Sequence, residues 1–390
     1  MSTTEQKSGH HVEAGKPTPP TSTLLGRALA ASPAGRPVGQ GGSTLLRNLI
    51  VTAVVVGVVM ALTYGLDTFF NFQLAYLLAY LSALIGLNVL IGLNGQLSLG
   101  HGAIMAVGGY TMGFTQNALV DAGFVDARAF ALWWTLLVSL VAAVLAAIVA
   151  GLLIGLAAAR LRGPYLAGVT LAVAVVVPGI TTTFDVFNGD QGIRVSVPRK
   201  PPSLGRAFPN EQWQAWVALF AVALVALLMA NLIRSRYGRM FRAVRDDEVA
   251  AQLSGIHVAR TQVIAFVVSA ATAGLSGGIF VFIVKNAQPG FFSLNLSLYL
   301  VLALVIGGLG SISGAIWGAL FLVLVPYGTQ KLGEALLLSP DMQLKLKGNL
   351  PLAIFGLALI VVTIIAPGGI QALVRRIGAW LVGLVRRPAG

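Results

Sequence analysis

The chain has 390 residues, of which 56% are hydrophobic and only 10% are charged, and its mean hydropathy is +0.84. Soluble domains carry roughly a quarter charged residues, so these values exclude an ordinary soluble protein and predict an integral membrane protein. A net charge of +13 would indicate a nucleic-acid partner in a soluble protein, but in a membrane protein it reports on topology, and no nucleic acid is expected. The absence of Cys excludes disulfides and thiolate metal sites, and the four His are too scattered for a metal cluster.

The chain begins with a polar segment and continues with strongly apolar runs. Residues 1–45 are rich in Ser, Thr, Pro and Gly without apolar periodicity, which predicts a disordered cytoplasmic tail with no cleaved signal. Residues 46–370 form the predicted transmembrane permease domain, because their apolar runs have the length of about 20 residues that a bilayer requires. The runs are Leu46–Leu66, Phe72–Leu93, Leu99–Leu119, Leu132–Ala158, Tyr165–Phe184, Trp213–Ile233, Gln262–Val284, Leu298–Pro326 and Leu350–Ala366.

One of these runs, Leu298–Pro326, is too long for a single span and is interrupted by Gly307, Gly308, Gly310 and Gly314. We therefore expect two shorter segments that meet at these glycines. The fold class predicted is an all-α polytopic membrane protein with about ten membrane segments, some of them short or broken, so both termini lie on one side.

Basic residues indicate which side that is. Most of the 26 Lys and Arg lie in the N-terminal tail, in residues 234–261 and in the basic C-terminal tail 371–390. Because Lys and Arg accumulate on the cytoplasmic side, the prediction is a multi-pass plasma (inner) membrane protein with cytoplasmic N- and C-termini. The Pro-rich segment Ile193–Glu211 and the Leu- and Lys-bearing segment Tyr327–Asn349 then lie outside, the latter as an interfacial helix.

A glycine-rich segment, GLNGQLSLGHG from Gly92 to Gly102, places four polar residues at the edge of an apolar run: Asn94, Gln96, Ser98 and His101. It lacks the Gly-Lys-Ser/Thr ending of a phosphate-binding loop. A broken helix is tolerated at membrane depth only against protein or a water-filled path, so these residues are candidates for the translocation pathway. A simple cytoplasmic turn is the alternative.

The acidic residues closest to a predicted span are Asp67, Asp121, Asp185 and Glu211, and each falls just outside its end. Ion-coupled carriers commonly place a carboxylate within the bilayer, so this pattern disfavours a stand-alone secondary carrier. No convergent set of acid, base, nucleophile or metal ligands is visible, so no enzymatic site is expected. Energy is then expected to come from another subunit.

Residues Gly238–His257 form a densely charged segment between two apolar runs, within the predicted loop 234–261. Val249, Ala250 and Leu253 recur at helical spacing, and Gly255 is a suitable helix stop. The arrangement E-x-A-A-x-x-x-G from Glu248 to Gly255 predicts a helix that docks into a soluble partner. A loop whose arginines only determine topology is the alternative.

The chain resembles the permease subunits of branched-chain amino-acid (leucine/isoleucine/valine) ABC importers. Four stretches carry the resemblance, in the order found in the family: Gly92–Thr111, Gly163–Thr181, Gly238–Gly278 and Val305–Leu320. It implies a second homologous permease subunit, two cytoplasmic ATPase subunits and an extracytoplasmic solute-binding protein as partners. It also implies no bound cofactor, because the partner subunits bind the ATP.

The resemblance further assigns the loop as the helix that couples transport to the ATPase. Residues with an implied role in this coupling are Arg242, Arg245, Asp246 and Glu248, through polar contacts, and Ala250, Ala251 and Gly255, through close approach. Relatives of the same shape carry urea or short amides, so the substrate stays open between a hydrophobic amino acid and another small solute.

Overall fold

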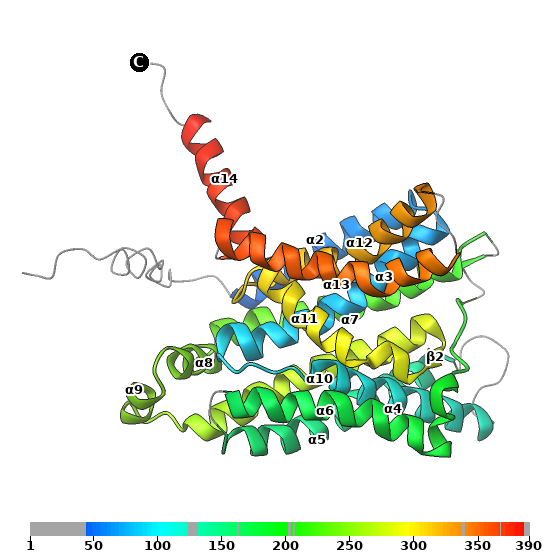
Figure 1. Cartoon of the computed structure of the whole chain (residues 1–390), viewed down its shortest axis with the longest axis horizontal. Coiled ribbons are helices and arrows are strands. Elements are labelled where there is room, and N and C mark those ends of the chain that lie inside the picture. Colours follow the sequence, from blue (N-terminus) through cyan, green and yellow to red (C-terminus); the bar gives the residue numbers. More distant parts are fainter. Residues whose placement is uncertain are drawn as a thin grey trace, which may run out of the picture. The chain divides into compact units, whose positions relative to one another are not determined.

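The computed structural model describes residues 44–123, 132–161, 164–201, 204–205, 207–336, 340–366 and 368–385, so nearly all of the predicted tail 1–45 lies outside the described residues. The described chain is almost entirely helical (Figure 1). Its long helices are α2 (Thr44–Thr63), α3 (Thr68–Leu87), α4 (His101–Asp121), α5 (Leu132–Ala158), α6 (Pro164–Thr183), α7 (Asn210–Arg234), α10 (Val258–Val284), α11 (Leu294–Gly307), α12 (Ile312–Ala335), α13 (Pro340–Ile365) and α14 (Gly369–Val385). The shorter helices are the π-helix η1 (Asn88–Leu93), α8 (Arg236–Asp246), α9 (Glu248–Leu253) and the 3-10 turns η2 (Asp185–Phe187), η3 (Gly189–Gln191) and η5 (Pro289–Phe292).

The prediction of an all-α polytopic protein is confirmed, and every predicted span corresponds to a helix. Eight helices in the described residues are long and apolar enough to cross a membrane, or nine if α13 and α14 form one bent span. The predicted count of about ten is reached when α4 is included: its Gly, Thr, Gln and Asn residues lower its hydropathy below that of the other spans. This helix of 21 residues packs alongside α5 and α10.

Two predictions at the C-terminal end need correction. The glycine break lies where it was expected, between α11 and α12, but α12 does not end at Pro326 and continues to Ala335. The predicted interfacial helix Tyr327–Asn349 is therefore not a separate element, because its first part completes α12 and its last part begins α13. Most of the predicted C-terminal tail forms helix α14.

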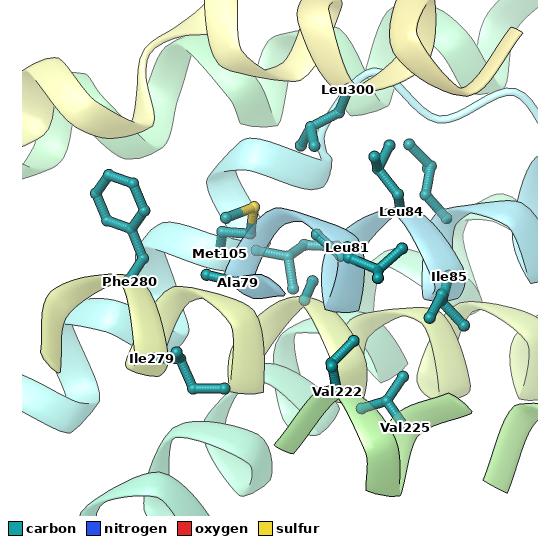
Figure 2. Packing of buried hydrophobic residues seen from close by; sticks show 14 of the residues in the cluster. Ala79, Leu81, Leu84, Ile85, Met105, Val222, Val225, Ile279, Phe280 and Leu300 are labelled. Carbon is teal, nitrogen blue, oxygen red and sulfur yellow. The ribbon is translucent and has the colours of Figure 1, made fainter. Parts of the chain in front are cut away.

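The core is centred on α10, which packs against α3, α4 and α5. Close approach depends on small residues, as expected in a bilayer that supplies no hydrophobic driving force between helices. Gly274 of α10 lies against Gly108 of α4 on one side and Ala147 of α5 on the other, with no room for a further Cβ. Figure 2 shows Ile279 and Phe280 of α10 packed near the buried face of α3.

The two ends of α10 carry different structures (Figure 1). The pair α8–α9 precedes it, whereas a short antiparallel sheet follows it, formed by β1 (Ile193–Arg194) and β2 (Asn286–Ala287). Because α10 has 27 residues and rises about 1.5 Å per residue, these two regions lie roughly 40 Å apart at opposite ends of the helix.

Candidate functional site

The charged loop folds into two short helices whose ends are capped by its own polar residues. Ser235 Oγ accepts a hydrogen bond from the Tyr237 N–H at the start of α8. Asp247 Oδ1 accepts from the N–H groups of Val249 and Ala250, at 2.8 and 3.0 Å, and so begins α9. The predicted stop is confirmed, because Gly255 adopts a left-handed φ of +81° and the Ile256 N–H returns to the Ala251 carbonyl.

Helix α9 presents an apolar face away from the protein. The side chains of Val249 and Leu253 are 66% and 85% exposed, and Ala250 is exposed beside them. The predicted stripe therefore exists and is uncovered in this chain. The expectation that Ala251 allows close approach of the ATPase is wrong. Ala251 is 3% exposed and packs against Val244 of α8 and Val258 of α10, so it holds α9 in place and does not face a partner.

The polar residues of the loop divide into inward-facing and outward-facing ones. Arg245 donates to the Gly92 carbonyl at 2.8 Å through Nη1, and its other nitrogens bind Asp246 Oδ1. Glu248 Oε1 accepts from Gln262 Nε2 of α10 at 3.0 Å. Arg242 is partly exposed on α8. Arg245 and Glu248 thus bind within their own chain, which a docking role through polar contacts did not anticipate.

The glycine-rich segment interrupts a membrane helix, as predicted. Helix α3 passes into the π-helix η1, and residues 94–100 then run without regular helix until α4 begins. Gly95, with a φ of +75°, makes the turn that a residue with a side chain rarely adopts. The freed backbone groups are bound by other helices: Leu99 N–H donates to Thr170 of α6, and Gly102 N–H donates to Ser297 of α11.

All four candidate pathway residues are buried in this segment. His101 Nε2 lies 3.2 Å from the Ala83 carbonyl. The polar atoms of the Asn94 and Ser98 side chains, and Gln96 Oε1, have no hydrogen-bond partner among the described residues. Unpaired buried polar groups are energetically unfavourable and concentrate where a structure binds something or changes conformation.

Gly92 is the point where three distant parts of the chain meet. Its carbonyl accepts from Arg245, and its Cα lies against Gly310 in the break between α11 and α12. The Gly310 N–H donates to Asn88 Oδ1 of η1 at 2.7 Å. The two glycine-rich breaks are therefore in direct contact, and the charged loop binds the same junction.

A cavity of about 520 Å³ joins the two sets of candidate residues. Asn94 and Gln96 line one side, and Arg245, Asp246 and Glu248 line the other. Ser98 and His101 do not line it. The sequence treated the loop and the broken segment as separate candidates, whereas the fold makes them the walls of one site.

The family of permease components of branched-chain amino acid transport systems matches residues 68–366. The chain belongs to this family. The predicted resemblance is thereby confirmed, and it covers both glycine-rich breaks and the charged loop. No solved structure matches the chain.

Curated relatives of the family are similar over most of the chain. The high-affinity branched-chain amino acid transport system permease protein LivM of Escherichia coli is 31% identical over 311 residues, which cover 72% of this chain and 68% of LivM. LivM of Salmonella typhimurium is 31% identical over 265 residues, covering 61% of this chain and 58% of the relative. LivH of Escherichia coli, the permease protein of a system with the same name, is 28% identical over 61% of this chain and 77% of its own length.

Sequence reasoning missed several residues of the site. Asp247 was detectable, because an Asp directly before an apolar helical pattern is a common N-cap. Gln262, Asn88 and Thr170 were not, because each lies in an apolar run and acts only on a residue brought near by folding.

Proposed function

We propose that this chain is the membrane permease subunit of an ATP-driven importer that moves branched-chain or other hydrophobic amino acids delivered by a solute-binding protein. Its membership in the permease family supports the transport role. The names of the relatives LivM and LivH support the substrate class. The permease itself holds no ATP in this proposal, since two cytoplasmic ATPase subunits bind it.

The observation that carries the proposal is the position of α9. Its exposed apolar face is the surface on which an ATPase docks, because a helix face left apolar outside the membrane needs a protein partner. The same loop holds Gly92 through Arg245. A displacement of α8–α9 by the ATPase therefore acts directly on the junction of the two broken spans, where the pathway opens.

A second permease subunit completes the proposed transporter. The chain is similar to both LivM and LivH, which are two different permease proteins with the same system name. The partner permease contributes the other wall of the pathway, and residues Asn94 and Gln96 line this chain's side of it.

Orientation in the membrane is part of the proposal. The α8–α9 face is cytoplasmic together with both termini, and the β1–β2 face receives the solute-binding protein. A topology reporter inserted after Lys200 is expected to report an extracytoplasmic position, and one inserted after Leu253 a cytoplasmic position. The reverse pattern would contradict the docking of an ATPase on α9.

Uptake into proteoliposomes tests the function. Vesicles that contain the permease pair and the ATPase subunits are expected to accumulate leucine only with ATP and the binding protein present. Leu253→Asp should abolish co-purification of the ATPase and reduce uptake at least tenfold, whereas Ala259→Asp, at an exposed position on α10, should not. Uptake without ATPase subunits would show a stand-alone carrier, and uptake of urea or short amides alone would move the substrate to that class.

A further inference from the structure

An apolar groove lies between α2 and α3, both of which pack against α7. It has a volume of about 580 Å³ and is lined by residues of α2, α3, α7 and α12. Ala223 and Ala226 of α7 form its floor, and Val51 and Val55 of α2 line one wall. An empty apolar space of this size forfeits dispersion contacts along its whole lining, so in a membrane it is filled.

Hydrogen bonds at both ends of α2 hold the groove open. At the outer end, Thr63 Oγ1 accepts from Gln212 Nε2 and Trp216 Nε1 of α7, at 3.1 and 3.0 Å. At the inner end, Asn48 Nδ2 donates to Asn231 Oδ1 at 2.8 Å. Because these polar pairs join α2 to α7 at both ends, α2 cannot move across α7 toward α3 without breaking them.

The groove is charged at one end only. Arg47 of α2 and Arg234 of α7 line its inner end, the end next to α8. Arg234 Nη1 donates to Asn48 Oδ1 at 3.2 Å, which fixes the guanidinium at the groove mouth and leaves further N–H donors available. No carboxylate lines the groove within the described part of the chain.

The length of the groove matches the thickness of one leaflet of a bilayer. Val59, at the far end of the lining, lies twelve residues after Arg47, or about 18 Å along the helix. Half of the hydrocarbon core is about 15 Å thick. The two arginines then stand at headgroup depth on the membrane face that carries α8 and α9, and the apolar floor spans the acyl region of that leaflet.

We propose that the groove is a binding site for an anionic glycerophospholipid of the inner leaflet. One acyl chain lies between α2 and α3 along α7, and the phosphate is bound by Arg47 and Arg234. Basic pockets between transmembrane helices near the membrane surface select anionic headgroups in this way. Occupancy fills the space under α2 and fixes this peripheral helix to the bundle, independently of the transport cycle.

Native mass spectrometry of the detergent-purified full chain tests the site. After exchange into mixtures of phosphatidylglycerol and phosphatidylcholine, the chain is expected to retain one phosphatidylglycerol. If each arginine contributes about fivefold to binding, the double variant Arg47→Ala with Arg234→Ala should weaken retention about 25-fold. Arg160→Ala, at an exposed arginine at the end of α5, is the matched control and should leave retention unchanged.

A second variant tests the contribution of the apolar groove independently of the two arginines. Ala226→Phe keeps both arginines and fills the floor, so it should also remove the bound lipid. Equal retention of phosphatidylcholine and phosphatidylglycerol, or no retained lipid at all, would overturn the proposal. So would cysteine crosslinking that places residues 1–43, a second copy of the chain or another permease against Val55 in the intact complex.

Discussion

The guanidinium of Arg245 donates a hydrogen bond to the backbone carbonyl of Gly92, 2.8 Å away and 153 residues apart in the chain. This bond joins a helix outside the membrane to the point where a membrane helix is interrupted. Charge-assisted hydrogen bonds are about twice as strong as neutral ones, so the bond can transmit a displacement of α8. Arg245 therefore has a more direct relation to the candidate pathway than to the partner surface.

Removal of this side chain should uncouple transport. Arg245→Ala is expected to retain ATPase binding and ATP hydrolysis while leucine uptake falls at least tenfold, because the exposed face of α9 stays intact. Arg239→Ala, at an exposed position of the same helix without this bond, is the control and should keep uptake within twofold. The two rates are measured in the same proteoliposomes, and normal uptake by Arg245→Ala would refute the link.

The contact between the two glycine breaks predicts a stability effect. A Cβ at Gly92 would lie 3.1 Å from the Gly310 Cα and meet Asn88 Oδ1, so Gly92→Ala should destabilise the protein by about 1–3 kcal/mol. Gly168→Ala, on α6 with open space around it, should be neutral or slightly stabilising. Thermal unfolding in detergent compares the two variants, and equal melting temperatures would contradict the tight junction.

The effect of replacing Gly255 should depend on whether the new residue adopts a left-handed backbone conformation, and not on the size of its side chain. Gly255 has a φ of +81°, and a Cβ added to it would have no neighbouring atom within 4 Å. Gly255→Asn should therefore keep most ATPase binding, since Asn adopts the left-handed region, whereas β-branched Gly255→Val should reduce it several-fold. Co-purification of the ATPase measures the difference, and equal binding by both variants would show that the cap does not matter.

Single cysteines can distinguish a water-filled pathway from packing, since the natural chain contains none. Gln96→Cys lines the cavity beside Arg245 and is expected to react with a water-soluble maleimide, at a rate that changes when ATP is added. Ala103→Cys, fully buried in α4, should remain unlabelled. Complete protection of Gln96→Cys in every nucleotide state would favour a packing role for this segment.

Local patterns were sufficient for much of the architecture. Apolar runs of bilayer length located the spans, and glycines located both helix breaks and the end of α9, because hydropathy and backbone freedom act within a few residues. The same reasoning ended α12 at Pro326, where packing in fact carries the helix to Ala335. The family resemblance assigned Ala251 to a partner surface, but a sequence motif does not say which side of a short helix the protein itself covers.

The sequence by itself determined the class of protein, the order of its membrane segments and the residues that interrupt them. Only the tertiary structure decided that Arg245 binds Gly92 and that Asn88 binds Gly310, 222 residues away. Such contacts arise where small residues let helix backbones approach and polar groups left free by one break find partners in another. No local pattern encodes that pairing, because it depends on how all the helices pack around α10.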